Sequence, residues 1–273
     1  MNAFHAIVLG FVQGATEFLP VSSTAHLRIV SSFFGWKDPG AAFTAVTQLG
    51  TMAAVLIFFR RDVGRILTAW FKGIRDPSAR QNHDAKMGNY IAIGTVPILL
   101  IGFAFHKQIE TNLRNLVFIA LALIVFAGIL MYAEDTSRQD RDLDSLSARD
   151  GIAIGLAQAV ALIPGVSRSG ATITAGLMLG FDRVAAARYS FLLSIPAVVL
   201  SGVYELRKIG EGGGAGVVPT VVATLIAFVV GYASIAGLLK FLQSRSTRVF
   251  VIYRVLLGLL VLSLVAGSVI SAT

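Results

Sequence analysis

Long apolar runs alternate with short polar stretches along most of the chain. Six of these runs are about 20 residues long, the length of a membrane-spanning helix. They predict spans near 41–60, 88–106, 115–133, 186–204, 217–239 and 250–271. Charged residues make up only 14% of the 273 residues, against roughly 25% in soluble domains. The pattern therefore predicts an all-α integral membrane protein.

Two further apolar regions are interrupted by polar residues. The region 1–35 breaks at "PVSS", which begins at Pro20, and the region 151–181 breaks at "PGVSRS", which begins at Pro164. The piece before the second break would be about 20 Å long as a helix, too short to cross the bilayer. Irregular backbone at membrane depth needs protein or a watery cavity around it. We therefore expect two re-entrant hairpins, each built from two half-helices.

The two interrupted regions resemble each other. "GFVQGATEFLPVSSTAHL" aligns with "GLAQAVALIPGVSRSGAT", which pairs Gln13 with Gln158 and Pro20 with Pro164. Each region precedes three spans, so the chain is predicted to contain one repeat at about 1–133 and another at about 150–273. Because an odd number of spans separates the two hairpins, the second copy is inverted. Inverted repeats with broken helices commonly build an intramembrane site.

Basic residues predict the orientation of the chain. The stretches 60–86, 134–150 and 240–249 hold 7, 3 and 3 Lys or Arg residues, whereas 106–114 and 204–216 hold two each. By the positive-inside tendency, the first three are cytoplasmic, which gives cytoplasmic loops at about 61–87 and 134–150. Both termini and the entry of the first hairpin then lie outside.

The net charge of +8 fits this topology and anionic headgroups better than it fits a nucleic-acid partner. The absence of cysteine excludes disulfides, thiolate metal sites and a cysteine nucleophile.

Both breaks carry the residue types that bind phosphate. Ser, Thr and free backbone N–H groups at a helix start form an anion site. The candidate caps are Ser22, Ser23 and Thr24 in the first break and Ser167 and Ser169 in the second. Arg168 lies between the two later serines, and its planar guanidinium suits bidentate phosphate binding. If the inverted repeats meet, both helix starts face one phosphate.

Glu17 is discordant beside an expected phosphate, because the two charges repel. It could share a divalent cation with the phosphate, act as a protonated general acid, or act as a base. Gln13 lies one helical turn earlier on the same face, and Mg²⁺ is often held by few protein oxygens plus phosphate. Candidate nucleophiles are Ser22, Ser23, Thr24, His26 and water.

Each of these residues also has a purely structural interpretation. The serines and Thr24 can be helix caps, His26 can be a core or interfacial histidine, and Glu17 with Arg168 can form a structural ion pair. Gln48 can hydrogen-bond a neighbouring helix. Arg254 lies near the cytoplasmic end of its span and can extend toward the interface.

The two breaks carry a resemblance to a known family. "QGATEFLPVSSTAH" and "PGVSRSGAT" resemble the two signature motifs of the undecaprenyl-diphosphate phosphatase family of the bacitracin-resistance type. "TQLGTMAA" and "IYR" resemble further family features, so the resemblance covers essentially the whole chain. Where the family pattern permits Glu or Gln, this chain has Gln13, so it offers one carboxylate to a cation at this motif and not two.

The resemblance implies a bacterial inner-membrane hydrolase that converts undecaprenyl diphosphate to undecaprenyl phosphate and inorganic phosphate, with its site open to the periplasm. It implies a divalent cation, Mg²⁺ or Ca²⁺, with Glu17 as the main acidic residue and Gln13 as its partner. The residues near the reacting phosphate would be Ser22, Ser23 and His26, and those that hold the phosphates would be Ser167, Arg168, Ser169 and Thr172.

A polyprenyl-phosphate transporter or flippase is the alternative, because the same architecture supports alternating access. A scaffold protein is a third, blander alternative, and it leaves the ionisable residues at membrane depth without a role. The sequence leaves open whether the protein forms a homodimer, which cation it uses and which residue is the nucleophile.

Overall fold

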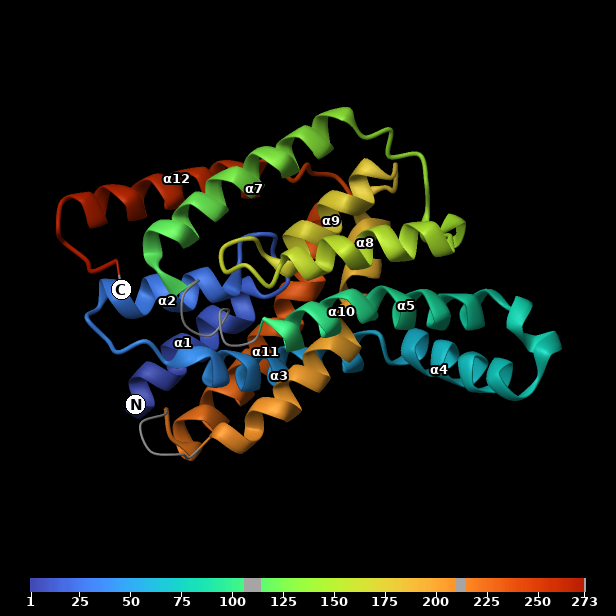
Figure 1. The fold of residues 1–273 in the computed structure, drawn as a ribbon, viewed down its shortest axis with the longest axis horizontal. Coiled ribbons are helices and arrows are strands. Elements are labelled where there is room, and N and C mark those ends of the chain that lie inside the picture. The colour runs from blue at the N-terminus through green and yellow to red at the C-terminus, as the bar shows by residue number, and fades with distance from the viewer. Residues whose placement is uncertain (106–113, 210–214, 273) are drawn as a thin grey trace.

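The computed structural model describes residues 1–105, 114–209 and 215–272 of the chain. Every regular element among these residues is helical, as the hydropathy pattern predicts (Figure 1). The six long apolar helices are α3 Gly40–Phe58, α5 His83–Ala104, α7 Leu116–Thr136, α10 Arg183–Glu205, α11 Val217–Leu242 and α12 Arg248–Ala266. Each is long and apolar enough to cross a membrane. The six predicted spans are thereby confirmed, with small shifts at their ends.

Both interrupted regions form pairs of short helices. The first pair is α1 Ala3–Thr16 and α2 Ser23–Phe33, and the second is α8 Ala148–Val160 and α9 Arg168–Met178. At about 1.5 Å per residue none of the four is long enough to span the bilayer by itself. The prolines lie in the breaks because proline removes a backbone donor and clashes with the preceding helical turn. The breaks are where predicted, and the re-entrant course of each pair remains a prediction.

The segment predicted as a cytoplasmic loop at about 61–87 is largely helical, and its place on the cytoplasmic side stays a prediction. It contains the amphipathic helix α4 Arg60–Arg75, the 3₁₀ turn η1 Pro77–Gln81 and the first residues of α5. Ile66 and Gly73 of α4 are buried, Gly73 lies beside Arg80 of η1 and Ala85 of α5, and Trp70 closely contacts Gly88 of α5. The predicted loop at 134–150 begins only after α7 and includes the short turn η3 Leu143–Ser145. The predicted outer loops at 106–114 and 204–216 lie partly outside the described residues.

Helices of the first predicted repeat pack against helices of the second in matching pairs. Helix α1 of the first repeat packs along α11 of the second, and α8 of the second packs along α5 of the first (Figure 1). Glycines allow both close crossings: a Cβ at Gly10 of α1 would overlap Ala223 of α11, and one at Gly155 of α8 would overlap Gly94 of α5. The corresponding spans α3 and α10 pack on each other, as do α7 and α12. The two breaks therefore meet at the centre of the fold.

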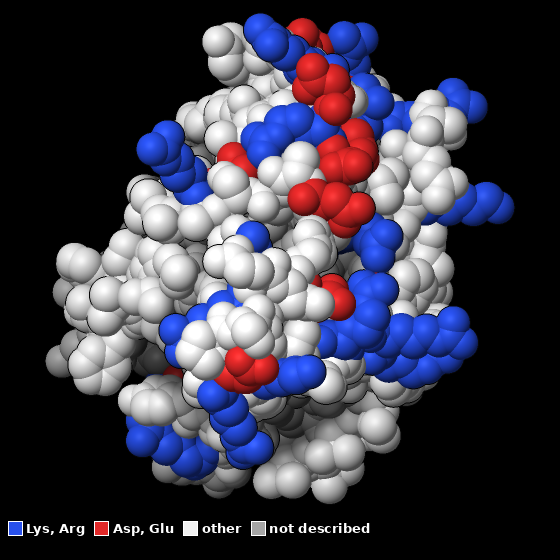
Figure 2. All heavy atoms as spheres, turned by 90° about the vertical axis from the view of Figure 1, so that its right-hand side faces the viewer, with Lys and Arg blue, Asp and Glu red and all other residues white. Residues whose placement is uncertain are grey.

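Ion pairs gather at the end of the molecule where α7 ends and α10 and α12 begin. Figure 2 shows this end, where Lys and Arg side chains cluster with Asp and Glu among them. Buried Glu134 pairs with Arg183 and accepts hydrogen bonds from the backbone N–H and hydroxyl of Thr247, at 3.3 and 2.8 Å. Outside the spans, hydrogen bonds to Asp150 raise the pKa of Arg141. This end is the one that the basic residues predict to be cytoplasmic.

Glu134→Ala is expected to lower the free energy of unfolding by about 2–4 kcal/mol, because it leaves half-buried Arg183 without its partner and the buried N–H and hydroxyl of Thr247 without an acceptor. Unfolding in detergent micelles, followed by circular dichroism, measures this loss. The matched control is Asp135→Ala, since Asp135 pairs with Arg248 in an exposed position where a pair contributes about 1 kcal/mol or less. Equal losses in the two variants would contradict the conclusion that buried Glu134 holds α7 to the starts of α10 and α12.

Candidate active site

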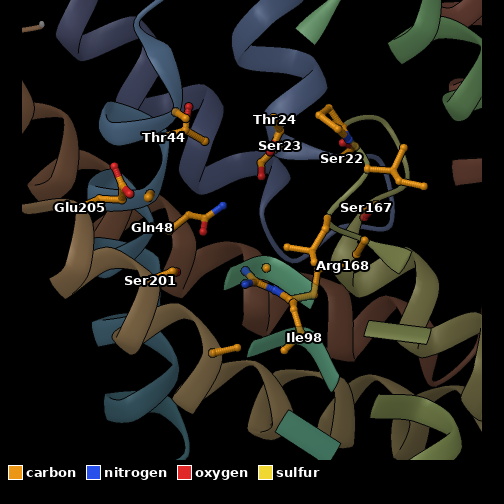
Figure 3. Close-up of a pocket in the computed structure, with 18 of the residues that line it drawn as sticks. Ser22, Ser23, Thr24, Thr44, Gln48, Ile98, Ser167, Arg168, Ser201 and Glu205 are labelled. Atoms are coloured by element: carbon orange, nitrogen blue, oxygen red, sulfur yellow. The ribbon is translucent and has the colours of Figure 1, made fainter. Parts of the chain in front are cut away.

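A cavity of about 610 Å³ lies where the two breaks meet (Figure 3). The polar residues at its inner end come from both breaks and are Glu17, Ser22, Ser23, Thr24, Ser167 and Arg168. Helices α3, α5 and α10 supply the other walls. The cavity thus joins residues that lie roughly 150 positions apart, as the inverted-repeat prediction requires.

The helices that follow the breaks begin in the same way. Ser22 precedes α2 with a φ of +73°, and Ser167 precedes α9 with a φ of +74°. Such a backbone is strained for a residue with a side chain, by about 1–3 kcal/mol, and persists where the surroundings enforce it. Each serine caps its helix, because the Ser22 hydroxyl accepts from Ala25 N–H and the Ser167 hydroxyl accepts from Gly170 N–H. Two helix starts with their positive dipole ends therefore face one cavity.

This geometry also corrects the register of the repeat. Ser22 follows Gln13 by nine residues, and Ser167 follows Gln158 by the same nine. With the serines matched, Pro20 aligns with Gly165 and not with Pro164. The sequence alignment that paired the two prolines is therefore wrong by one residue at that point. The glycine occupies its position with a φ of +99°, which costs glycine little.

Glu17 is the centre of the polar network. Its Oε2 accepts hydrogen bonds from Gln13 Nε2 at 2.7 Å and from Ser23 Oγ at 2.6 Å. Its Oε1 forms an ion pair with Arg168. Ser23 is the first residue of α2 and Arg168 is the first residue of α9. The repeat therefore places a hydroxyl and a guanidinium at equivalent helix positions, on either side of one carboxylate.

Two residues predicted to bind phosphate lie behind the cavity wall. Ser169 Oγ donates to the Leu19 carbonyl at 3.0 Å, which ties the second helix start to the first break. Thr172 Oγ1 lies 2.6 Å from Ser190 Oγ of α10. Neither is among the described residues that line the cavity. In this structure Ser169 and Thr172 position the helix start that carries Arg168.

His26 also lies behind the wall. Its Nδ1 is 2.8 Å from the Ser22 carbonyl oxygen and its Nε2 is 2.6 Å from the Tyr253 hydroxyl. A carbonyl oxygen only accepts, so a neutral ring carries its proton on Nδ1 and accepts from Tyr253 on Nε2. Among the described residues the cavity lining does not include His26. The ring therefore holds the Ser22 turn, and both of its nitrogens have partners.

Arg254 is fully buried, and this corrects the interpretation that it extends to the membrane interface. Its guanidinium donates to Pro20 O at 3.2 Å, to Gly165 O at 3.0 Å and to Val166 O at 3.1 Å. A fourth bond reaches Leu123 O of α7 at 3.2 Å. No carboxylate lies among these partners, so among the described residues it is backbone carbonyl dipoles that compensate the charge. Arg254 joins the first break to the second directly behind the two helix starts.

Polar residues on the far wall were mostly missed by the sequence analysis. Thr44 and Gln48 lie one turn apart on α3, and Ser201 and Glu205 lie one turn apart on α10 (Figure 3). Of these four, only Gln48 had been singled out. It makes no described side-chain hydrogen bond to a neighbouring helix and lines the cavity. Paired polar residues one turn apart in apolar spans were the signal that could have identified this wall.

Arg114 lines the cavity at the end of α5 and α7 that is predicted to lie outside. Its guanidinium donates to both carboxylate oxygens of Asp38, at 2.8 and 2.6 Å, and Arg28 lies 3.6 Å from the same carboxylate. Burial raises the pKa of Asp38, but the hydrogen bonds and charge of Arg114 more than offset this, so the net shift is downward. Two cations beside one anion leave this part of the cavity wall positive.

The donor atoms around Glu17 suit a hard divalent cation. Carboxylate and amide oxygens are the ligand types of Mg²⁺ and Ca²⁺, and Gln13 Oε1 is buried without a hydrogen-bond partner among the described residues. Those residues contain no group of three or more His, Asp or Glu side chains that could hold a metal ion. A cation here would therefore depend on phosphate oxygens as well as on the protein.

The arrangement has the parts that phosphoryl transfer needs. A hydroxyl hydrogen-bonded to a carboxylate is an activated nucleophile, and Ser23 with Glu17 forms such a pair. A guanidinium and two helix starts supply positive charge where a phosphoryl group would carry negative charge. The rest of the cavity lining is largely apolar. The site therefore fits an amphiphilic phosphate ester or anhydride.

Comparisons with known proteins agree with this chemistry. Residues 6–260 match the family model described as bacitracin resistance protein BacA. An undecaprenyl-diphosphatase of Paenarthrobacter aurescens is 55% identical over 277 residues, covering all of both chains. An undecaprenyl-diphosphatase of Thermobifida fusca is 53% identical over 271 residues, covering 99% of this chain and 93% of the relative. The chain belongs to the family of the bacitracin resistance protein BacA.

Proposed function

We propose that this protein is a membrane-embedded phosphatase that hydrolyses undecaprenyl diphosphate to undecaprenyl phosphate and inorganic phosphate. This reaction would recycle the lipid carrier of cell-wall synthesis. The observation that carries the proposal is the contact of Ser23 and Arg168 with one buried carboxylate, Glu17, in a cavity with apolar walls. The names of the relatives support hydrolysis over the transport alternative, which does not need a hydroxyl paired with a carboxylate.

In the first step the terminal phosphate enters between the two helix starts and replaces Glu17 as the ion-pair partner of Arg168. Ser23 Oγ attacks the terminal phosphorus, and its proton passes to Glu17 Oε2. Before the reaction, Ser23 Oγ already donates a hydrogen bond to this oxygen, with 2.6 Å between the two atoms. The bond between that phosphorus and the bridging oxygen breaks. The oxygen leaves with undecaprenyl phosphate, which takes the proton from Glu17. Arg168 and the helix starts stabilise the charge on the transferred group.

In the second step water hydrolyses the phosphoserine. Glu17 takes a proton from the attacking water, and that proton returns to Ser23 Oγ as the oxygen–phosphorus bond breaks. Inorganic phosphate leaves, and Arg168 pairs again with Glu17. The capping serines, His26 and Arg254 keep the helix starts in position throughout both steps.

A divalent cation, Mg²⁺ or Ca²⁺, is part of the proposal. Glu17 would hold it together with substrate phosphate oxygens, and Gln13, which is buried next to Glu17 but does not line the cavity, would add its Oε1 as a further ligand. The cation would neutralise charge on the diphosphate. Gln13 supplies an uncharged oxygen where a second carboxylate would bind the cation more strongly. We expect the cation to bind mainly as a complex with the substrate.

We further propose that the protein lies in the bacterial inner membrane with its cavity open to the periplasm. The cavity lining includes Ala41, Phe103, Arg114 and Tyr204, which lie at the helix ends predicted to be outside. The opposite end of the molecule carries the basic stretches (Figure 2). The positive-inside tendency then supports a periplasmic opening.

Purified protein in detergent micelles is expected to release inorganic phosphate from undecaprenyl diphosphate, as a colorimetric phosphate assay measures. A chelator should abolish release, and added Mg²⁺ or Ca²⁺ should restore it, because the cation is shared with the substrate. Release that is unaffected by chelation would remove the cation from the proposal. If labelled lipid crosses liposome membranes and is not hydrolysed, the transport alternative holds instead.

A further inference from the structure

The cavity is not closed on all sides. Five of its lining residues are solvent-exposed in the described structure, and all five come from α5 and α10; they are Leu99, Phe103, Leu200, Ser201 and Tyr204. The exposed fractions of Leu99 and Phe103 on α5 are 37% and 80%, and that of Leu200 on α10 is 53%. The lining residues from the two breaks and from α3 are buried or half-buried. The cavity therefore opens sideways, between two apolar spans.

The course of α5 and α10 accounts for this opening. A Cβ added at Gly94 of α5 would lie 3.0 Å from Leu193 of α10, so the two helices are close there. Each helix then has an internal proline, Pro97 in α5 and Pro196 in α10. Proline removes a helical hydrogen bond and bends the helix. The lining residues of both helices begin directly after these prolines, so the prolines mark the level at which the gap begins.

A glycine keeps the gap free on the α5 side. Gly102 lines the cavity one turn after Ile98, and the nearest atoms to a Cβ at this position are those of Leu162, at 3.6 and 3.8 Å. These are ordinary contact distances, so a small side chain would fit there. A large side chain at this position would take up space in the cavity beside Leu162, on the α5 side of the opening.

The volume of the cavity decides what must pass through this opening. A pocket of about 610 Å³ is in the range that encloses a drug-sized ligand. A chain of eleven isoprene units is clearly larger than this cavity, so a large part of it has to lie outside. Its lowest-energy surroundings are the acyl chains of the bilayer, and the opening between α5 and α10 leads there through apolar residues.

We propose that the gap between α5 and α10 is a lateral portal, through which the polyprenyl chain beyond its first isoprene unit leaves the cavity and passes into the lipid. This inference rests on the proposed function and assigns the lipid-binding part of the same site. Substrate then enters sideways from the membrane with its diphosphate leading toward Arg168. Polar Ser201 and Gln48 lie on the path of the diphosphate, whereas Leu99 and Leu200 contact the chain.

The test is a bulky residue at Gly102, assayed with a long and a short substrate. Gly102→Phe is expected to raise KM for undecaprenyl diphosphate by about tenfold or more, an effect of the size that a few methylenes produce in an apolar pocket. Hydrolysis of dimethylallyl diphosphate, whose chain is a single isoprene unit, should keep its wild-type rate. The matched control is Gly128→Phe on α7, because nothing lies within 4 Å of a Cβ at that position.

A second measurement avoids any effect of the substitution on folding. The chain has no cysteine, so Leu200→Cys introduces a single thiol at the portal, which is modified in the folded protein with a bulky methanethiosulfonate. Modification should inhibit hydrolysis of the long substrate only, and a reducing agent should reverse it. Leu225→Cys is the control, since Leu225 of α11 is 62% exposed away from the cavity lining.

The outcomes separate the two proposals. Selective loss with undecaprenyl diphosphate, in the variant and on modification, supports the portal. Equal effects on the long and the short substrate, or no effect of the modification, would overturn it while leaving the phosphatase proposal intact. A wild-type protein that hydrolyses neither substrate would overturn the phosphatase proposal itself.

Discussion

Replacement of Ser23 with alanine is expected to reduce phosphate release from undecaprenyl diphosphate by about 10⁴-fold or more, the size of loss that follows removal of a nucleophile. Ser23 Oγ lies 2.6 Å from Glu17 Oε2 and faces the cavity, so no other described hydroxyl has both a base and access to substrate in this structure. Direct trapping gives the sharpest measurement. Substrate labelled in its terminal phosphate should leave label on Ser23 in acid-quenched wild-type protein.

Thr24→Val is the matched control, because Thr24 is the next residue and also lines the cavity, and its hydroxyl has no described bond to Glu17. This variant should keep a rate within about tenfold of wild type, as expected for a residue that does not form a bond with the substrate. Label on His26 would assign the nucleophile to the imidazole and contradict its place behind the wall. Turnover without label on any residue would favour direct attack by water.

The centre of this site could be predicted because ionisable residues at membrane depth are rare. Glu17 and Arg168 stand out for that reason, and the serines stand out because they follow prolines in otherwise apolar sequence. Their mutual contact follows from the inverted repeat, which brings the two breaks together. Sequence alone did not predict that Ser23 and Arg168 bind opposite oxygens of the same carboxylate.

The residues behind the site could not be predicted in the same way. Arg254 binds backbone carbonyls of three distant segments, and a carbonyl carries no signal in the sequence because every residue has one. The partner of His26 is Tyr253, 227 residues away. Tyr253 and Arg254 both belong to the stretch "IYR". The role of this stretch became visible only in the structure, where α12 lies beside the two breaks.

The membrane spans could be predicted from hydropathy, but helix α4 could not be predicted from its charged residues. The spans were predicted because about 20 consecutive apolar residues form a helix as long as the bilayer core is thick. Helix α4 was missed because its many basic residues indicated a loop. Its exposed apolar residues Leu67, Phe71 and Ile74 nevertheless recur at helical spacing, so periodicity was the better guide in that segment.

Replacement of Arg254 with methionine is expected to lower kcat by about 10²-fold, because small displacements of a positioned reacting group have effects of that size. The change leaves the carbonyl oxygens of Pro20, Gly165 and Val166 in the two breaks without this donor, and it also removes the bond to Leu123 O of α7. Each orphaned group costs about 1–3 kcal/mol, so the unfolding temperature should also fall. Steady-state hydrolysis of undecaprenyl diphosphate and thermal unfolding in micelles measure the two effects.

The conservative variant separates positioning from bulk stability. Arg254→Lys keeps the charge, but one ammonium group cannot reach carbonyls of both breaks and of α7, whereas the planar guanidinium does so with three nitrogens. Arg254→Lys should therefore recover part of the stability while kcat stays low. Arg248→Met is the control on the same helix, since Arg248 is exposed and pairs with Asp135. Wild-type kcat in Arg254→Lys would show that the fork geometry, and with it the alignment of the two helix starts, is not needed for turnover.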